Sequence, residues 1–132
     1  MRLHTVEIGY FEDYEDDEVL EVAIAGVDAT GARRSFSFQR ATCEPDEQDV
    51  QGGMDSYCVS NERGETLYGC LRLVRRDGSH LTLEFTADDA AILELTGPVE
   101  ADLGTADGAE FGAKLRDVLD WGAEDRRPEL HL

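Results

Sequence analysis

The sequence predicts an α+β fold: an antiparallel β-sheet of hairpins and a meander, with two α-helices in the C-terminal half packed on one face. Short segments in the first two-thirds of the chain alternate apolar and polar side chains, as half-buried strands do. Turn-forming groups of Gly, Asp and Asn separate these segments. Helical spacing and capping signals appear only after residue 85.

The length of 132 residues fits one domain and is large enough to bury a core without disulfides or a structural metal. We expect a single α+β domain over residues 1–122. The polar residues 123–132 are expected to form a frayed C-terminal tail.

Three strands are predicted in the N-terminal third. Residues 3–11 are rich in β-forming side chains, and residues 19–27 are a nearly continuous apolar run typical of a buried strand. Residues 33–40 alternate, which places Phe36 and Phe38 on one face. The second and third strands are expected to form a hairpin.

The middle of the chain predicts a long loop and then a meander. Residues 41–54 are polar, acidic and glycine-containing, so we expect a flexible loop of unusual length. Strands are expected at residues 57–60 and 66–75, joined across residues 61–65, and at residues 80–85.

The C-terminal third carries the helix signals. Thr86 is an N-cap with acidic residues in the following turn, and this helix is expected to run to about Leu95. A short strand is expected at residues 99–103, and Asp107 is a candidate N-cap for the last helix. The buried face of that helix is predicted by apolar residues at helical spacing: Phe111, Leu115, Val118 and Leu119.

The net charge is −18, from 30 acidic and 12 basic side chains. This excess should repel nucleic acid and anionic membranes, which bind through Lys and Arg. It should attract basic proteins and speed their association. The alternative is that the charge serves solubility alone, as in a salt-adapted proteome.

Residue patterns for catalysis and metal binding are missing, so we expect no enzyme activity, no cofactor and no metal. No pair of carboxylates stands out from the other acids. The three histidines are scattered, and residues 12–18 lack the central Gly and distal Glu of a calcium hand. Gly52 and Gly53 lie in an acidic loop with no Lys after them, which argues against phosphate binding.

Three cysteines, Cys43, Cys58 and Cys70, lack zinc or redox spacing, and the N-terminus shows no secretory signal. We therefore expect a cytoplasmic protein with reduced thiols, although a Cys58–Cys70 disulfide across a hairpin is geometrically conceivable.

Two acidic segments are the candidate partner-binding site. If both lie at one edge of the sheet, they form one negative surface with Tyr10, Phe11 and Tyr14 as aromatic anchors. The alternative is that both are simply solvated. The candidate contact residues are Glu12, Asp13, Tyr14, Glu15, Asp16, Asp17, Glu18, Glu44, Asp46, Glu47 and Asp49.

A resemblance adds to this interpretation. The motifs Tyr57-Cys58-Val59, Leu67-Tyr68-Gly69-Cys70, Leu81-Thr82-Leu83 and Ala90-Ala91-Ile92-Leu93, closed by residues 111–119, resemble the immunity protein 10 family. Members are cytoplasmic antidotes encoded beside bacterial polymorphic toxins. The resemblance implies an immunity protein that neutralises a cognate toxin by stoichiometric blockade, without catalytic residues.

The cognate toxin is expected to be basic, and a nuclease is one candidate, because a nuclease needs a cationic surface that an acidic protein can occupy. The alternative function is a non-catalytic acidic binding or accessory module for another basic protein. A small hydrolase using clustered carboxylates is the third class, and it would need two acids with raised pKa values in a deep pocket. The sequence leaves the oligomeric state open.

Overall fold

The computed structural model describes residues 1–4 and 6–132, and these form one nine-stranded sheet in the order β5-β4-β3-β2-β1-β8-β7-β6-β9. The strands are β1 (Arg2–Asp13), β2 (Val19–Val27), β3 (Arg33–Ala41), β4 (Cys58–Asn61), β5 (Thr66–Tyr68), β6 (Leu71–Asp77), β7 (His80–Phe85), β8 (Val99–Asp102) and β9 (Glu129–His131). The helices are α1 (Glu47–Gln51), α2 (Ala87–Ile92), α3 (Gly108–Leu119) and the 3-10 helix η1 (Glu124–Arg126).

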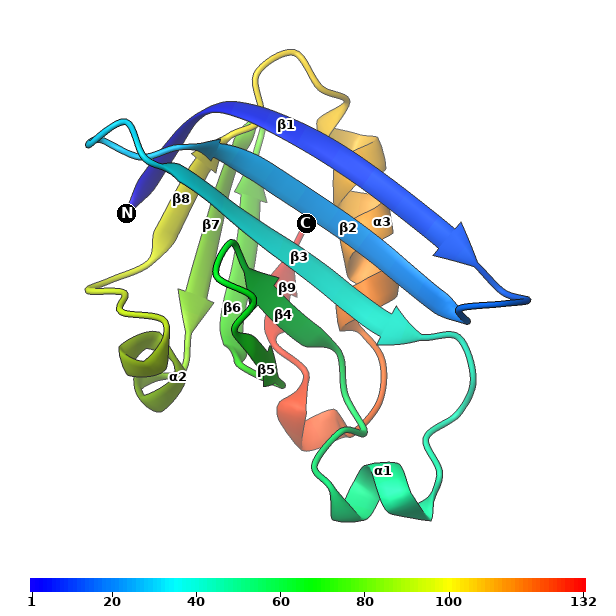
Figure 1. The fold of residues 1–132 in the computed structure, drawn as a ribbon. Helices are drawn as coiled ribbons and strands as arrows, with labels where there is room; N and C mark the ends of the chain where they lie inside the picture. Colours follow the sequence, from blue (N-terminus) through cyan, green and yellow to red (C-terminus); the bar gives the residue numbers. More distant parts are fainter.

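The sheet is open and mostly antiparallel, with β1 joining its two halves. Strands β1 to β5 form an antiparallel meander, and β6, β7 and β8 form a second one. The start of β1 pairs in parallel with β8, where Leu3 lies beside Ala101. Figure 1 shows β1, β2 and β3 side by side, crossing in front of β6, β7 and β8. The predicted α+β class is confirmed.

The core lies between the halves of the sheet and α3. Alternate side chains of β2 and β3 are buried, including Phe36 and Phe38, while their neighbours are half-exposed. The predicted face of α3 is buried as well, at Phe111, Leu115, Val118 and Leu119, and α3 contacts β2 and β3. The periodicities in the sequence therefore identified both surfaces that pack together.

The prediction of one strand over residues 66–75 is wrong. The chain turns at Gly69, whose φ is +60°, so β5 ends at Tyr68 and β6 begins at Leu71. The two strands lie far apart in the sheet order. The buried Tyr57 hydroxyl accepts a hydrogen bond from the Leu71 N–H at 2.9 Å and donates one to the Leu71 carbonyl at 3.3 Å. This side chain supplies the partners that both backbone groups need at the crossover.

The expected fraying of the last residues is also wrong. Residues 124–126 form η1, and β9 pairs in parallel with β6, from Leu73 beside Glu129 to Arg75 beside His131. Leu130 and Leu132 pack against the core. The polar composition hid these contacts, because two apolar side chains suffice to anchor a three-residue strand at a sheet edge.

The capping signals identified the starts of α2 and α3, but α1 forms within the segment expected to be a flexible loop, and some element bounds differ from those expected. Thr86 and Asp107 cap α2 and α3 by accepting from the backbone N–H groups of Asp89 and Glu110. Helix α2 ends at Ile92 rather than near Leu95, and β1 extends to Asp13, into the segment expected to be a loop. Among the described residues, no helix has the length and apolar character that crossing a bilayer requires.

Candidate partner-binding site

The two acidic segments leave the sheet at the same end. Residues 12–18 comprise the end of β1 and its connection to β2, and residues 44–49 follow β3. Because neighbouring strands are antiparallel, β1 and β3 end where β2 begins, and the register aligns Asp13, Val19 and Ala41. The Thr42 N–H donates to the Glu18 carbonyl at 3.0 Å, which bonds the end of the first segment to the chain just before the second. Figure 1 shows the β1–β2 turn and the end of β3 at the same end of the sheet.

A groove of about 270 Å³ lies between the two segments. Its rim is acidic, its floor comes from β2, β3, β4 and β5, and Trp121 closes it from the end of α3. We call it the acidic groove; it is lined by Asp17, Glu18, Val19, Gln39, Arg40, Ala41, Asp49, Met54, Ser56, Cys58, Tyr68 and Trp121. The structure thus brings Asp17, Glu18 and Asp49 together from both predicted segments.

Four of the predicted site residues also have structural roles. Glu12 lies in β1 and forms an ion pair with Lys114 at 2.8 Å. Asp13 accepts hydrogen bonds from two backbone N–H groups of the following turn, and these bonds lower the pKa of its carboxyl. Asp46 and Asp49 form the capping box that starts α1. Neutralising these four would disturb the local fold as well as the surface charge.

The other predicted acids have exposed side chains, and they form no ion pair within the described part of the chain. They are Glu15, Asp16, Asp17, Glu18, Glu44 and Glu47. The Glu18 carboxylate accepts only a weak bond from the Cys43 thiol, at 4.0 Å. Carboxylates without an ion-pair partner in the described chain remain available to a basic group of another molecule.

The aromatic residues expected as anchors divide into two groups. Tyr14 is the most exposed, at 62%, and it lies within the acidic turn. Tyr10 lies under the Lys114 ammonium, 6.0 Å from the ring centre, and Phe11 lies opposite Glu21 in the β1–β2 register. Tyr14 is therefore the one whose side chain is most open to a partner.

Sequence reasoning missed the apolar side chains around the groove. Met54 lines the groove and is exposed at 44%, and Tyr68 is half-buried in its wall. Val50, exposed at 57%, lies in α1 next to the lining residue Asp49. The only signal for Val50 and Met54 was the presence of two apolar residues in a loop that is otherwise polar. Tyr68 and Trp121 carried no such signal, because their contribution depends on the tertiary fold.

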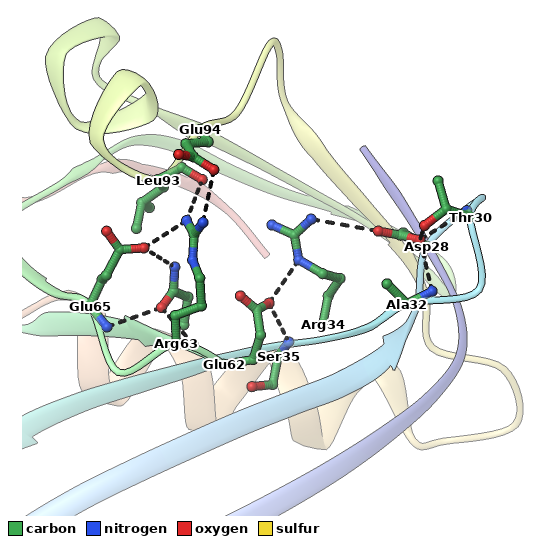
Figure 2. Close-up of polar contacts among 11 residues, drawn as sticks. Asp28, Thr30, Ala32, Arg34, Ser35, Glu62, Arg63, Glu65, Leu93 and Glu94 are labelled. Carbon is green, nitrogen blue, oxygen red and sulfur yellow. Dashed lines mark hydrogen bonds and ion pairs between the residues drawn. The ribbon is translucent and has the colours of Figure 1, made fainter.

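At the other end of β2, basic side chains neutralise the acids (Figure 2). Arg34 lies between Asp28 and Glu62, at 3.5 and 2.8 Å. Arg63 forms ion pairs with Glu65 and Glu94 and also donates to the Leu93 carbonyl. The unpaired negative charge of this sheet half is thus concentrated at the groove end.

Arg126 fixes the α1 side of the groove. Its guanidinium donates to the carbonyl oxygens of Gly53 and Tyr68, the latter at 2.8 Å, and lies 3.7 Å from the Asp55 carboxylate. The side chain packs over Gly69, where a Cβ would come within 2.6 Å of the guanidinium Nε. The C-terminal segment therefore holds the loop after α1 against β5.

We expect Arg126→Ala to lower the free energy of unfolding by about 1–2 kcal/mol, because two hydrogen bonds from a charged donor are lost at a partly exposed site. Urea denaturation measures this change. Arg116→Ala is the control, since it removes the same charge from an exposed position on α3. Equal stability of the two variants would contradict the role given to Arg126.

The described residues offer little chemistry for catalysis. Asp13, Asp28 and Glu94 have pKa values lowered by hydrogen bonds, opposite to the direction that a general acid needs. No group of three metal-ligating side chains gathers within the described residues. All three cysteines are free thiols, and burial raises the pKa of Cys70 to about 12, which makes it unreactive.

The comparisons with known proteins identify the family. The family model of immunity protein 10 matches residues 4–111, from β1 into the first turn of α3. No significant match is found among curated proteins or among solved structures. Since the match spans well over half of the 132 residues, the chain belongs to the immunity protein 10 family.

Proposed function

We propose that this protein is a cytoplasmic antidote that binds and neutralises a basic cognate toxin by stoichiometric blockade, using the two acidic segments. The observation that carries this proposal is the acidic groove, where carboxylates from both segments lie beside apolar and aromatic side chains. A charged rim around apolar and aromatic side chains is the usual anatomy of a protein interface.

The charge distribution supports rapid capture. An antidote must bind before the toxin acts, and complementary charge raises association rates by about ten- to a thousandfold. A nuclease is the toxin class that this surface suits best, because a nuclease carries a cationic face for its substrate. Blockade of that face requires no catalytic group on the antidote.

The test uses the toxin encoded beside this chain and a variant with four carboxylates of the first segment neutralised: E15Q, D16N, D17N and E18Q. These side chains form no ion pair with the described residues, so the fold should be retained. We expect association at low salt to slow by about tenfold, with the rates of variant and parent converging at high salt. Stopped-flow binding and protection of cells expressing the toxin provide the two readouts.

The matched control removes the same charge elsewhere, with D77N, D88N, E124Q and E129Q. Equal slowing by both variants would mean that net charge alone acts, and the acidic segments would then not be the contact. Binding of the toxin without protection would instead favour the alternative, an accessory module for a basic partner.

A further inference from the structure

The surface of the described residues carries several hollows that differ in construction. One of about 510 Å³ is lined by residues of α3 and its C-cap alone, and one of about 270 Å³ is lined by β1, β2 and β3. Another, of about 340 Å³, lies between β6, β7, α2 and the segment before β8, and its one carboxylate, Glu84, is paired with Arg72. The acidic groove is built from the β1–β2 turn, strands β2, β3, β4 and β5, the α1 region and Trp121. Among these hollows, the groove is the one that joins three carboxylates with apolar side chains from several elements.

The groove suits a side chain that is apolar along its stem and cationic at its end. Val19, Ala41, Cys58 and the exposed Met54 provide apolar surface, and Asp17, Glu18 and Asp49 provide the negative rim. Its volume of about 270 Å³ is just below the roughly 300–1,000 Å³ of small-molecule sites, which suits one inserted side chain.

The basic residue in the lining does not neutralise the groove. Arg40 lies over the Trp121 ring, 5.5 Å from its centre. Its guanidinium donates to the carbonyl oxygens of Ala41 and Asp117 and forms an ion pair with the Asp117 carboxylate at 3.3 Å. Its charge is therefore offset by Asp117, outside the lining, and the groove itself remains negative.

We propose that the acidic groove is a specificity pocket that holds one arginine side chain of the toxin. This inference rests on the proposed function and deepens it, since it assigns one contact within the charged surface. The guanidinium would lie between the carboxylates of Asp17, Glu18 and Asp49, with the stem against Met54 and Tyr68.

Arginine is favoured over lysine by the composition of the walls. A guanidinium is planar, stacks on aromatic rings and binds carboxylates through two parallel hydrogen bonds. The half-buried Tyr68 offers an aromatic wall, and the pairing of β3, β4 and β5 places Cys58 between Tyr68 and Gln39, which also line the groove. An ammonium group gains less from such walls because it is more strongly hydrated.

The walls of the groove are held before any partner arrives. The capping box fixes α1, the Met54 N–H donates to the Asp49 carbonyl at 2.8 Å, and Arg126 holds Gly53. On the other side, the Thr42 N–H binds the Glu18 carbonyl. A pocket with fixed walls loses little conformational entropy on binding, which favours selective insertion.

The experiment uses two blocked peptides, acetyl-Gly-Gly-Arg-Gly-Gly-amide and its lysine counterpart, titrated at low ionic strength. Trp121 is the only tryptophan in the sequence and lines the groove, so its single indole N–H signal in an NMR spectrum reports occupancy. We expect the arginine peptide to shift this signal with about two- to fivefold higher affinity than the lysine peptide.

Two matched double variants in the β1–β2 turn test where the arginine side chain binds. D17N with E18Q removes two rim carboxylates, and E15Q with D16N removes two neighbouring charges outside the lining. The first pair should weaken the arginine peptide by about fivefold, and the second by less than about twofold, because only rim charges make close contact. Both pairs change the net charge by the same amount.

Three results would overturn the pocket: no shift of Trp121, equal affinity for both peptides, or equal weakening by both variant pairs. The proposed function is tested separately, by the association rate of the protein with the toxin. One outcome is that the variant with E15Q, D16N, D17N and E18Q slows toxin binding while the arginine and lysine peptides bind equally well. In that case the acidic surface attracts the toxin by its overall charge, and only the arginine pocket is wrong.

Discussion

Gly122→Ala is expected to lower the free energy of unfolding by about 3–5 kcal/mol. Gly122 has a φ of +82° and forms an isolated bridge with Ser56. A Cβ at this position would overlap the carbonyl oxygen of Asp55 and lie 2.9 Å from the Cα of Ser56. Both neighbours are backbone atoms that cannot rotate away, so overpacking adds to the cost of a left-handed conformation.

Gly104→Ala provides the control for this substitution. Gly104 has a similar φ of +64°, but, apart from its chain neighbours, no described atom lies within 4 Å of the position that a Cβ would take. We expect a loss of only about 1 kcal/mol there, from conformation alone. Urea denaturation of both variants separates steric overlap from backbone preference, and equal losses would show that the chain relaxes around residue 122 at no cost.

Tyr57→Phe is expected to lower the free energy of unfolding by about 2–3 kcal/mol. The side chain is fully buried, and its hydroxyl bonds both the N–H and the carbonyl of Leu71. Removing the oxygen leaves two buried backbone groups without a partner, and each such group costs about 1–3 kcal/mol before relaxation. Ring packing is retained, so the loss isolates the polar contacts.

Tyr14→Phe is the matched control, because its side chain is 62% exposed and its hydroxyl is free to bind water. That variant should stay within about 0.5 kcal/mol of the parent. Hydrogen exchange gives a second readout: the Leu71 amide should lose protection in Tyr57→Phe and keep it in Tyr14→Phe. Unchanged protection at Leu71 would contradict the bridging role of Tyr57.

Local patterns in the sequence were sufficient to predict most elements of this fold. A nearly continuous apolar run identified β2, alternation identified β3, and the buried stripe of α3 followed from its helical spacing. The break at Gly69 was missed because residues 66–75 remain rich in β-forming side chains across it. Only the positive φ and the long-range contacts of Tyr57 and Arg126 distinguish β5 from β6.

The acidic charge of the candidate site was predictable from the sequence, but the shape of the groove was not. The acidic runs were visible in the sequence, whereas the groove depends on strand order, which places β4 beside β3 and β5 beside β4. The structural roles of Glu12, Asp13, Asp46 and Asp49 were also hidden among their neighbours. Acidic residues of one run therefore serve two purposes, stabilising the local fold or supplying surface charge. Only the tertiary contacts show which purpose each residue serves.

The parallel pairing of β1 with β8 determines when the two halves of the sheet can join during synthesis. Leu3 lies beside Ala101, and the amino group of Met1 donates to the Pro98 carbonyl. A nascent chain can form the local β1–β2–β3 meander early, but the sheet is not joined until residue 101 has left the ribosome. The acidic segments therefore leave the ribosome before Trp121, which closes the groove, and before Arg126, which holds the loop after α1.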